Sequence, residues 1–241
     1  MVRCLLIMLN VQEINGGQVT QTEERTVLTL PPVENGYTNA QIDDYAGLRR
    51  RSYLHRPTRH LSLRASFNHT VGTAGFGFWN APYGDPATRT PALPKAVWFF
   101  SATEPNHLPF LHGQTGFFAA TIDVKPQHAL LAPLALANWL SGVEPRLWPK
   151  LTRLLGIRFA RVGVASAETH HYTIDWQPDK TTFAVDGRIV LTTSVSPNRP
   201  LGFVAWVDNQ YLIATPKGRF GSGVSPIEHS QQMILEQLTI S

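Results

Sequence analysis

Residues 170–187, HHYTIDWQPDKTTFAVDG, begin with a run in which polar and apolar side chains alternate. Strict alternation over 170–176 is typical of a β-strand with one face on a core and the other in water. We predict a turn over 177–180 and a second strand over 181–185. Asp186-Gly187 suits a two-residue hairpin turn, because both central positions of such a turn need a positive φ. Residues 188–193 are expected to pair back.

Strand patterns continue on both sides of this segment. Residues 61–68, LSLRASFN, alternate strictly, which predicts a strand with one wet face. The glycines of 75–80, GFGFWN, favour a close approach of neighbouring backbone or a bulge. Residues 95–101, KAVWFFS, are apolar on both faces. Further strands are predicted over 116–124, 200–211 and 233–240.

The composition agrees with an all-β domain. Of the 241 residues, 43% are apolar and 16% are charged, which excludes disordered and coiled-coil classes. The 18 glycines and 18 prolines punctuate the chain at intervals that suit short strands joined by turns. We therefore expect a single all-β domain over residues 1–241, a sandwich of two antiparallel sheets.

Residues 126–161 interrupt this pattern. Residues 129–140 are mostly Ala and Leu, and Leu147, Leu151, Leu154 and Leu155 recur at helical spacing. We predict a short helical insert that packs over a sheet edge. The alternative is a basic amphipathic surface for a protein partner or an anionic membrane surface, since few acidic residues balance the basic ones here.

Charge and cysteine content exclude several classes of protein. The net charge of +4 comes mainly from this insert and from the cluster of five arginines between 49 and 59, whereas nucleic-acid binders spread basic residues with aromatics along one groove. We therefore expect no nucleic-acid partner. No stretch reaches the roughly 18 apolar residues of a transmembrane segment. A single cysteine, Cys4, favours an intracellular protein, and we expect a cytoplasmic one.

The apolar run over residues 4–9, CLLIML, is shorter than the roughly 7–15 residues of a signal-peptide core. We interpret it as a buried first strand or as a wrongly assigned start of the chain. No metal-ligand spacing such as His-Glu-x-x-His is present in the sequence. We expect no cofactor, although a structural calcium ion held by loop carbonyls would leave no trace in the sequence.

His170, Tyr172, Trp176 and Asp186-Gly187 resemble, in type and spacing, a segment of the laminarinase-like glycoside hydrolases of family 16. The order of strands upstream, with a Gly-rich Phe-Trp strand, is also similar. The resemblance implies a concanavalin A-like jelly roll and an oligosaccharide or polysaccharide as ligand. Many proteins without hydrolase activity share this architecture.

The chain departs from the family where the family carries its chemistry. Family members place a Glu-x-Asp-x-x-Glu motif on the strand after the Phe-Trp strand, because a retaining hydrolase needs two carboxyl groups about 5–5.5 Å apart. At the equivalent place this chain has residues 96–102, AVWFFSA, with Glu104 alone beyond them. We therefore predict a lectin-like carbohydrate-binding protein on a hydrolase-like scaffold.

Trp206, Asp208 and Gln210 would share one face of a predicted strand. Aromatic faces contact the C–H surface of a sugar, and amides and carboxylates pair with its hydroxyls. The alternative is a polar turn after a buried tryptophan. Trp79 borders the sugar cleft in the resembling enzymes, but with five other tryptophans in the chain a core position is favoured. The predicted carbohydrate-binding residues are Arg64, Trp79, Asn80, His171, Trp206, Asp208, Asn209 and Gln210.

Two alternatives stay open. The first is a glycoside hydrolase or polysaccharide lyase with displaced catalytic residues, in which Arg64 or Gln210 would neutralise a uronate and Tyr211 or His171 would act as base. The second is a protein interaction module that acts through residues 126–161. Asp43 and Asp44 form another acidic spot, but adjacent strand residues point to opposite faces, so we expect no shared-proton pair there.

Overall fold

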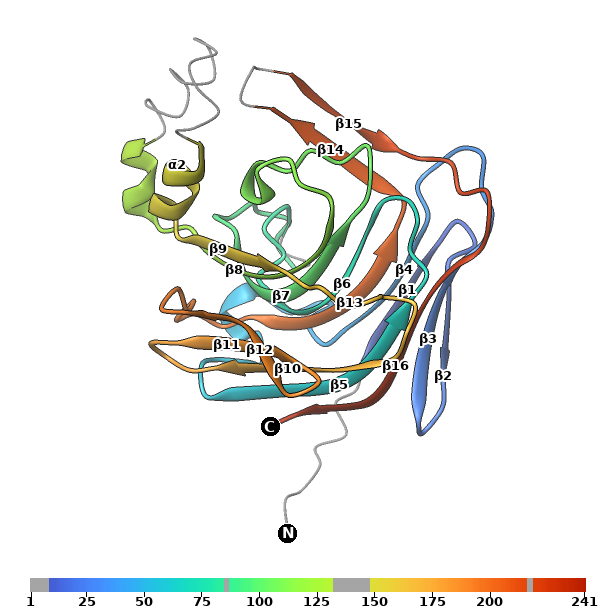
Figure 1. Cartoon of the computed structure of the whole chain (residues 1–241), viewed down its shortest axis with the longest axis horizontal. Coiled ribbons are helices and arrows are strands. Elements are labelled where there is room, and N and C mark those ends of the chain that lie inside the picture. Colours follow the sequence, from blue (N-terminus) through green and yellow to red (C-terminus); the bar gives the residue numbers. More distant parts are fainter. Residues whose placement is uncertain (1–8, 85–86, 132–147, 216–218) are drawn as a thin grey trace.

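The computed structural model describes residues 9–84, 87–131, 148–215 and 219–241. These residues form two curved seven-stranded antiparallel sheets that stack face to face, together with a two-stranded hairpin (Figure 1). The first sheet, called here the groove sheet, has the order β1 (Asn10–Ile14), β4 (Asn39–Asp43), β13 (Gly202–Asp208), β6 (Thr73–Trp79), β7 (Lys95–Ala102), β8 (Gly116–Asp123) and β9 (Ile157–Arg161).

The second sheet, called the outer sheet, has the order β12 (Arg188–Thr193), β11 (Thr181–Val185), β10 (His170–Trp176), β5 (Arg59–Phe67), β16 (Gln231–Ile240), β3 (Arg25–Leu30) and β2 (Gln18–Gln21). The hairpin pairs β14 (Gln210–Ala214) with β15 (Phe220–Val224). Short helices are η1 (Arg50–Ser52), η2 (Pro109–Leu111), η3 (Pro126–Leu131) and α2 (Trp148–Leu154). This is the all-β jelly-roll sandwich that the sequence predicted.

The main core lies between the two sheets. Leu61, Leu63, Ala65 and Phe67 of β5 are buried in it, so the alternation over 61–68 is confirmed. Phenylalanines of β6, β7 and β8 meet them from the groove sheet, and Tyr172 of β10 contacts the rings of Phe76, Phe99 and Phe117. Each such buried side chain contributes roughly 1.5–3 kcal/mol, which makes this layer the main source of stability.

The strands of residues 170–193 pair as predicted. β10 pairs antiparallel with β11, and β11 with β12. At the hairpin tip Asp186 has φ 49° and Gly187 has φ 76°, the left-handed conformation that the turn requires. The Asp186 carboxylate accepts a hydrogen bond from the His171 backbone N–H at 2.9 Å and contacts His170 Nδ1 at 2.6 Å. Both contacts are made by residues of the same segment, so local interactions hold the hairpin tip against β10.

The predicted insert over 126–161 is shorter than expected at its C-terminal end. Gly156, with φ 73°, follows α2, and residues 157–161 form β9, the edge strand that pairs with β8. The helical spacing of the leucines hid the strand because only two residues separate the end of α2 from the start of β9. Residues 132–147 of the insert lie outside the described residues, as does most of the predicted first strand over 4–9. The interaction surface proposed for 126–161 stays a prediction.

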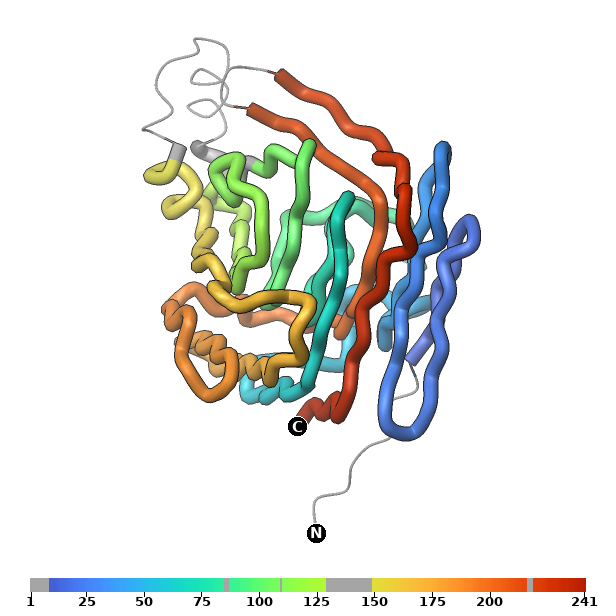
Figure 2. Tube along the Cα trace, turned by 45° about the vertical axis from the view of Figure 1, so that its right-hand side comes forward, coloured from blue at the N-terminus to red at the C-terminus, as the bar shows by residue number. Residues whose placement is uncertain are grey.

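The predicted strand over 200–211 is also divided. β13 ends at Asp208, and the chain turns at Asn209 out of the groove sheet into β14. Figure 2 shows β14 and β15 leaving the sandwich as a separate hairpin. This division of the strand makes the β14–β15 hairpin a wall beside the groove sheet.

In the described part of the chain, no helix has the length and apolarity needed to span a membrane.

Candidate functional site

A groove lies on the face of the groove sheet that points away from the core. Its larger part has a volume of ≈ 650 Å³, and an adjoining pocket of ≈ 490 Å³ shares Gln41, Trp79 and Tyr83 with it. Strands β1, β4, β13, β6, β7, β8 and β9 all contribute to the floor. The walls come from the β14–β15 hairpin, the 106–110 loop, and Pro82, Tyr83 and Pro94. The groove therefore crosses the strands of the whole sheet.

Three tryptophans occupy the middle of this floor. The ring centroids of Trp98 and Trp206 are 5.3 Å apart, those of Trp79 and Trp98 5.9 Å, and those of Trp79 and Trp206 6.4 Å. Gly75 and Gly77 of β6 make this possible. A Cβ at Gly75 would lie 2.8 Å from the Trp206 ring, and one at Gly77 would lie 2.7 Å from the Trp98 Cβ. The predicted close backbone approach at these glycines is confirmed.

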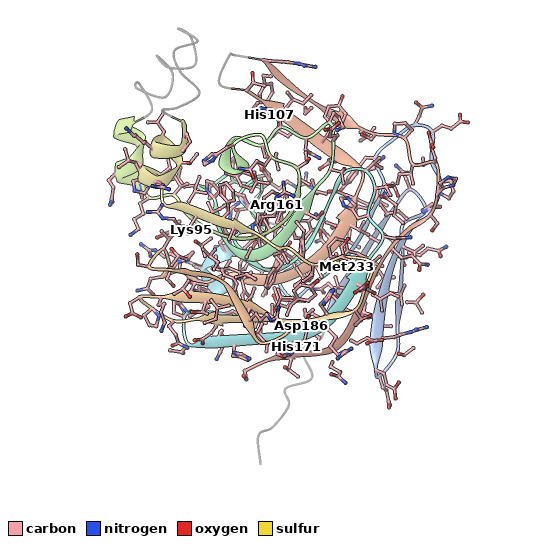
Figure 3. The ribbon with its side chains drawn as sticks, in the orientation of Figure 1. Lys95, His107, Arg161, His171, Asp186 and Met233 are labelled. Carbon is pink, nitrogen blue, oxygen red and sulfur yellow. The ribbon has the colours of Figure 1, made fainter. Side chains whose placement is uncertain are left out.

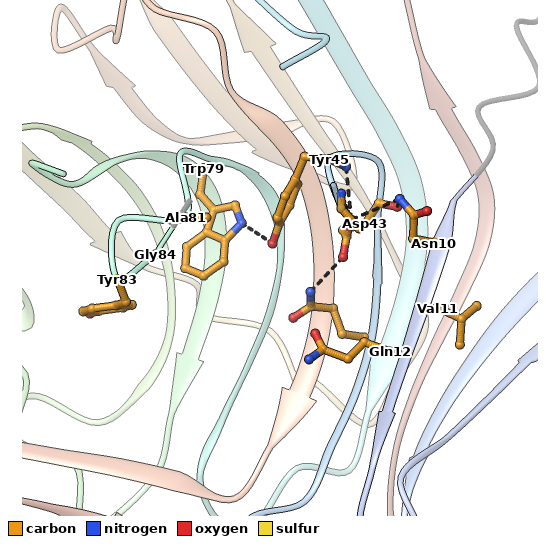
Figure 4. A pocket seen from close by; sticks show the side chains of 11 residues that line it. Asn10, Val11, Gln12, Asp43, Tyr45, Trp79, Ala81, Tyr83 and Gly84 are labelled. Atoms are coloured by element: carbon orange, nitrogen blue, oxygen red, sulfur yellow. Dashed lines mark hydrogen bonds between the residues drawn. The ribbon is translucent and has the colours of Figure 1, made fainter. Parts of the chain in front are cut away.

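Hydrogen bonds fix two of the indoles. Trp206 Nε1 donates to Thr73 Oγ1 at 3.0 Å. Trp79 Nε1 donates to the Tyr45 hydroxyl at 2.7 Å, a contact that Figure 4 shows at the edge of the smaller pocket. Aromatic side chains with their N–H groups held in this way present a fixed apolar surface.

Asp208 is a buried carboxyl group in the larger part of the groove. Its Oδ1 accepts hydrogen bonds from the Thr73 backbone N–H at 3.1 Å, from Thr73 Oγ1 at 2.9 Å and from the Gln210 N–H at 3.2 Å. Burial raises the pKa of Asp208 to about 7, although these hydrogen bonds oppose the shift. Burial, and then the charge of Asp208, also raises the pKa of the Tyr37 hydroxyl. Burial therefore favours the protonated form of this carboxyl group, which can donate a hydrogen bond, more than water would.

The smaller pocket is lined by amides (Figure 4). Gln41 Nε2 donates to Asp43 Oδ2 at 3.0 Å, and Asp43 Oδ1 accepts the backbone N–H groups of Tyr45 and Ala46. Tyr83, which is 83% exposed, lies at the mouth. Asp43 thus holds the turn after β4 and orients the amides of Asn10 and Gln41.

Asp44 has a different environment from Asp43. Its Oδ2 lies 2.5 Å from His55 Nε2, and its Oδ1 accepts the Phe203 N–H. Both side chains of this hydrogen-bonded pair are buried. Asp43 lines the groove and Asp44 does not, in agreement with the expectation that the two carboxyl groups diverge.

Four of the predicted site residues meet in the groove: Trp79, Trp206, Asp208 and Gln210 all line it. Asn80 and Asn209 are buried beside it and hold its walls. Asn80 accepts the Lys95 N–H and donates to the Leu93 carbonyl. Asn209 accepts the Thr38 N–H and donates to the carbonyls of Gly36 and Ser225. Gln210 lies on the hairpin, not on the strand of Trp206.

Arg64 and His171 do not reach the groove, so the prediction that they line it with Asp208 is wrong. Both project from the outer sheet on its face away from the core, where Arg64 Nε lies 4.0 Å from Glu236 Oε2 and His171 Nε2 lies 2.8 Å from Ser62 Oγ. Figure 3 shows His171 and Asp186 at the outer sheet. Alternation identifies the wet face of a strand but not the sheet to which the strand belongs. Of the four residues considered for a lyase, Gln210 and Tyr211 line the groove, whereas Arg64 and His171 lie on the outer sheet.

Several residues that line the groove were not predicted from the sequence. Asn39 and Gln41 alternate on β4, a signal too short to distinguish from a turn. Trp98 and Phe100 lie on a strand that is apolar on both faces, because Val97 and Phe99 face the core while Trp98 and Phe100 face the groove. Among the described residues, no group of three or more His, Cys, Asp and Glu side chains could hold a metal ion.

Comparison with known proteins identifies one family model and several solved structures that resemble this chain. A family model, glycosyl hydrolases family 16, matches residues 150–203, and no curated protein matches the chain. The chain is similar in structure to a pseudo β-1,3-glucanase and immunostimulatory antigen of Mycobacterium tuberculosis, with 12% identity, a TM-score of 0.52, and coverage of 90% of this chain and 74% of that one. For a laminarinase from a Flavobacterium species the values are 12% identity, a TM-score of 0.52, and coverage of 96% and 92%.

A sialidase structure aligns over 97% of this chain with 9% identity and a TM-score of 0.45, and there this chain spans 17% of the other protein. Identities this low establish the fold alone. The family match covers the β10–β12 segment on which the sequence resemblance rested. The resemblance to glycoside hydrolase family 16 is therefore confirmed, and the chain has the jelly-roll fold of the β-glucanases and laminarinases to which it is similar.

Proposed function

We propose that the chain is a lectin-like protein that binds an oligosaccharide or polysaccharide in the groove. The observation that supports this best is the cluster of Trp79, Trp98 and Trp206 beside the polar side chains of β4, β6 and β13. Flat apolar surfaces next to a few fixed hydrogen-bonding groups are the combination that sugar rings require.

The positions of the groove carboxyl groups support binding without hydrolysis. Asp43 pairs with Val204, whereas Asp208 pairs with Asn39, so the two acids are offset by four residues along neighbouring strands. At about 3.3 Å per residue this offset is about 13 Å. Retaining glycosidases need roughly 5–5.5 Å between their carboxyl groups, and inverting ones roughly 6.5–9.5 Å. This pair fits neither geometry.

Asp208 is the reason to test for catalysis all the same. A carboxyl group whose pKa is about 7 is in the range that suits a general acid or base at neutral pH. A hydrolase or lyase with displaced acids is therefore the second candidate function. Incubation with neutral β-glucans and with uronate polymers distinguishes the two: new reducing ends or unsaturated products would favour an enzyme, and their absence favours the binding protein.

Calorimetric titration with oligosaccharides of both classes tests the proposal directly. We expect binding to at least one, and a loss of about tenfold or more in affinity for Trp206→Ala. Because Trp206 is buried, Tyr83→Ala provides a second variant at an exposed groove position. Phe220→Ala, at a residue of β15 that is 70% exposed, is the matched aromatic control. Absence of binding, or unchanged affinity in both groove variants, would contradict the proposal.

A further inference from the structure

The chemistry of the groove changes from one side of the sheet to the other. On β1 and β4 its lining consists of the amides Asn10, Gln12, Asn39 and Gln41 together with Asp43 and the exposed Val11. The middle strands β13 and β6 contribute Trp206, Trp79, Thr73 and Asp208. From β7 to β9 the floor consists of Ala96, Trp98, Phe100, Ile122 and Ile157, apart from Lys95 at the start of β7.

The walls over the β7–β9 side are apolar as well. Leu108 and Phe110 come from the loop that contains η2, and Leu212 comes from β14. The Phe110 ring contacts the Phe100 ring at 5.7 Å between centroids. Lys95 is not a free donor there, because it forms an ion pair with Asp123. We call this part of the groove, lined by Phe100, Phe110, Ile122 and Ile157, the apolar end.

A uniform glycan does not suit both ends of such a groove. Every sugar ring carries hydroxyl groups, and a hydroxyl that leaves water without finding a new partner costs free energy. The polar side offers partners in quantity. There, the buried Asn39 Oδ1 accepts no hydrogen bond from the residues that the structure describes. In the middle of the floor, the buried Trp98 Nε1 likewise donates no hydrogen bond to any of them. The apolar end offers mainly surface for hydrocarbon.

We infer that the groove binds a glycoside whose aglycone is apolar, with the sugar on the tryptophan and amide side and the aglycone at the apolar end. This inference rests on the proposed function and names its ligand class. Burial of each aglycone methylene strengthens binding about fourfold in the ideal case. The cost of ordering the ligand reduces that gain.

The test compares methyl β-D-glucoside with hexyl β-D-glucoside by calorimetry on the whole chain. We expect the hexyl glucoside to bind at least tenfold more tightly. The hexyl ether of tetraethylene glycol, which has the same alkyl chain without a sugar, should bind at least tenfold more weakly than the hexyl glucoside. Equal affinity of the two glucosides, or equal affinity of the ether and the hexyl glucoside, would overturn the inference.

Variants locate the alkyl chain. Phe110→Ala should weaken binding of hexyl glucoside several-fold and leave methyl glucoside unchanged, whereas the same substitution at Phe220 should change neither. Equal weakening of both glucosides by Phe110→Ala would contradict the assignment of the apolar end. If oligosaccharides bind but the alkyl chain adds nothing, the inference fails and the proposed function stands. If no sugar binds in any form, both fail.

Discussion

Two faces of this molecule point away from the main core, and polar side chains of the strands lie on both. On the outer sheet, Arg64 and His171 are partly exposed and contact Glu236 and Ser62. On the groove sheet, Asp208 and Asn39 are buried beneath the hairpin and loops that form the groove walls. The two faces differ in what covers them. A polar residue on a strand becomes part of a site when another element encloses it.

The largest difference between the faces should appear in stability. Trp206→Ala is expected to lower the free energy of unfolding by about 3–5 kcal/mol, because it removes a ring that contacts Trp98 and Phe100. Arg64→Ala should change it by no more than about 0.5 kcal/mol. Urea denaturation of the three proteins measures both values. A similar loss in the two variants would remove the energetic distinction between the faces.

The next effect is a pH dependence carried by the groove face. Since the pKa of Asp208 is raised from 3.8 to about 7, the folded state holds a proton that the unfolded state has lost between these values. The stabilisation is complete below pH 4 and is lost as the pH rises through 7, at about 1.4 kcal/mol per pKa unit. Asp208→Asn keeps an Oδ1 that can accept the same hydrogen bonds, so it should remove this slope. Denaturation from pH 4 to 8 tests this, and an unchanged slope would exclude Asp208 as its source.

The outer face should show a weaker effect of opposite sign. The His171 backbone N–H, and then His170, lower the pKa of the exposed Asp186. This stabilisation is present above the ordinary pKa of the carboxyl group and is lost as the pH falls through the lowered value. Asp186→Asn, which retains a residue suited to the positive φ, should cost less than about 1 kcal/mol at neutral pH. The cost should shrink in acid, and a cost that persists there would point to the turn instead.

The smallest expected effect concerns ligands. Arg64→Ala and His171→Ala should leave the affinity for any bound glycan within about twofold, because both residues lie on the outer sheet, across the core from the groove. Calorimetry alongside Tyr83→Ala provides the comparison. A clear loss in either outer-face variant would show that the groove is not the only binding surface.

The parts of the fold that the sequence predicted are those that depend on local chemistry. The alternation over 61–68, the Asp186-Gly187 turn and the close approach at Gly75 and Gly77 each follow from side-chain size or backbone conformation. The sheet to which a strand belongs depends on pairing between residues distant in the chain. Arg64 and Asp208 therefore looked alike in sequence, although their strands belong to different sheets.

The candidate site was predicted only in its middle. Trp206 and Asp208 were evident because a strand rarely carries an indole and a carboxyl group on one face. Trp98 and Phe100 were not, because a strand buried on both sides by two separate clusters has no periodicity that distinguishes a groove from a core. The turn at Asn209 depends on hydrogen bonds to Gly36, Thr38 and Ser225, which no local pattern indicates.

The spacing of the three indoles has an optical consequence. With ring centroids 5.3 to 6.4 Å apart, the electronic transitions of Trp79, Trp98 and Trp206 couple to one another. Coupled chromophores give paired circular-dichroism bands of opposite sign whose intensity depends on the angles between the rings. A ligand that tilts the half-buried Trp79 changes those bands. Circular dichroism can therefore detect ligand binding in the groove without an added label.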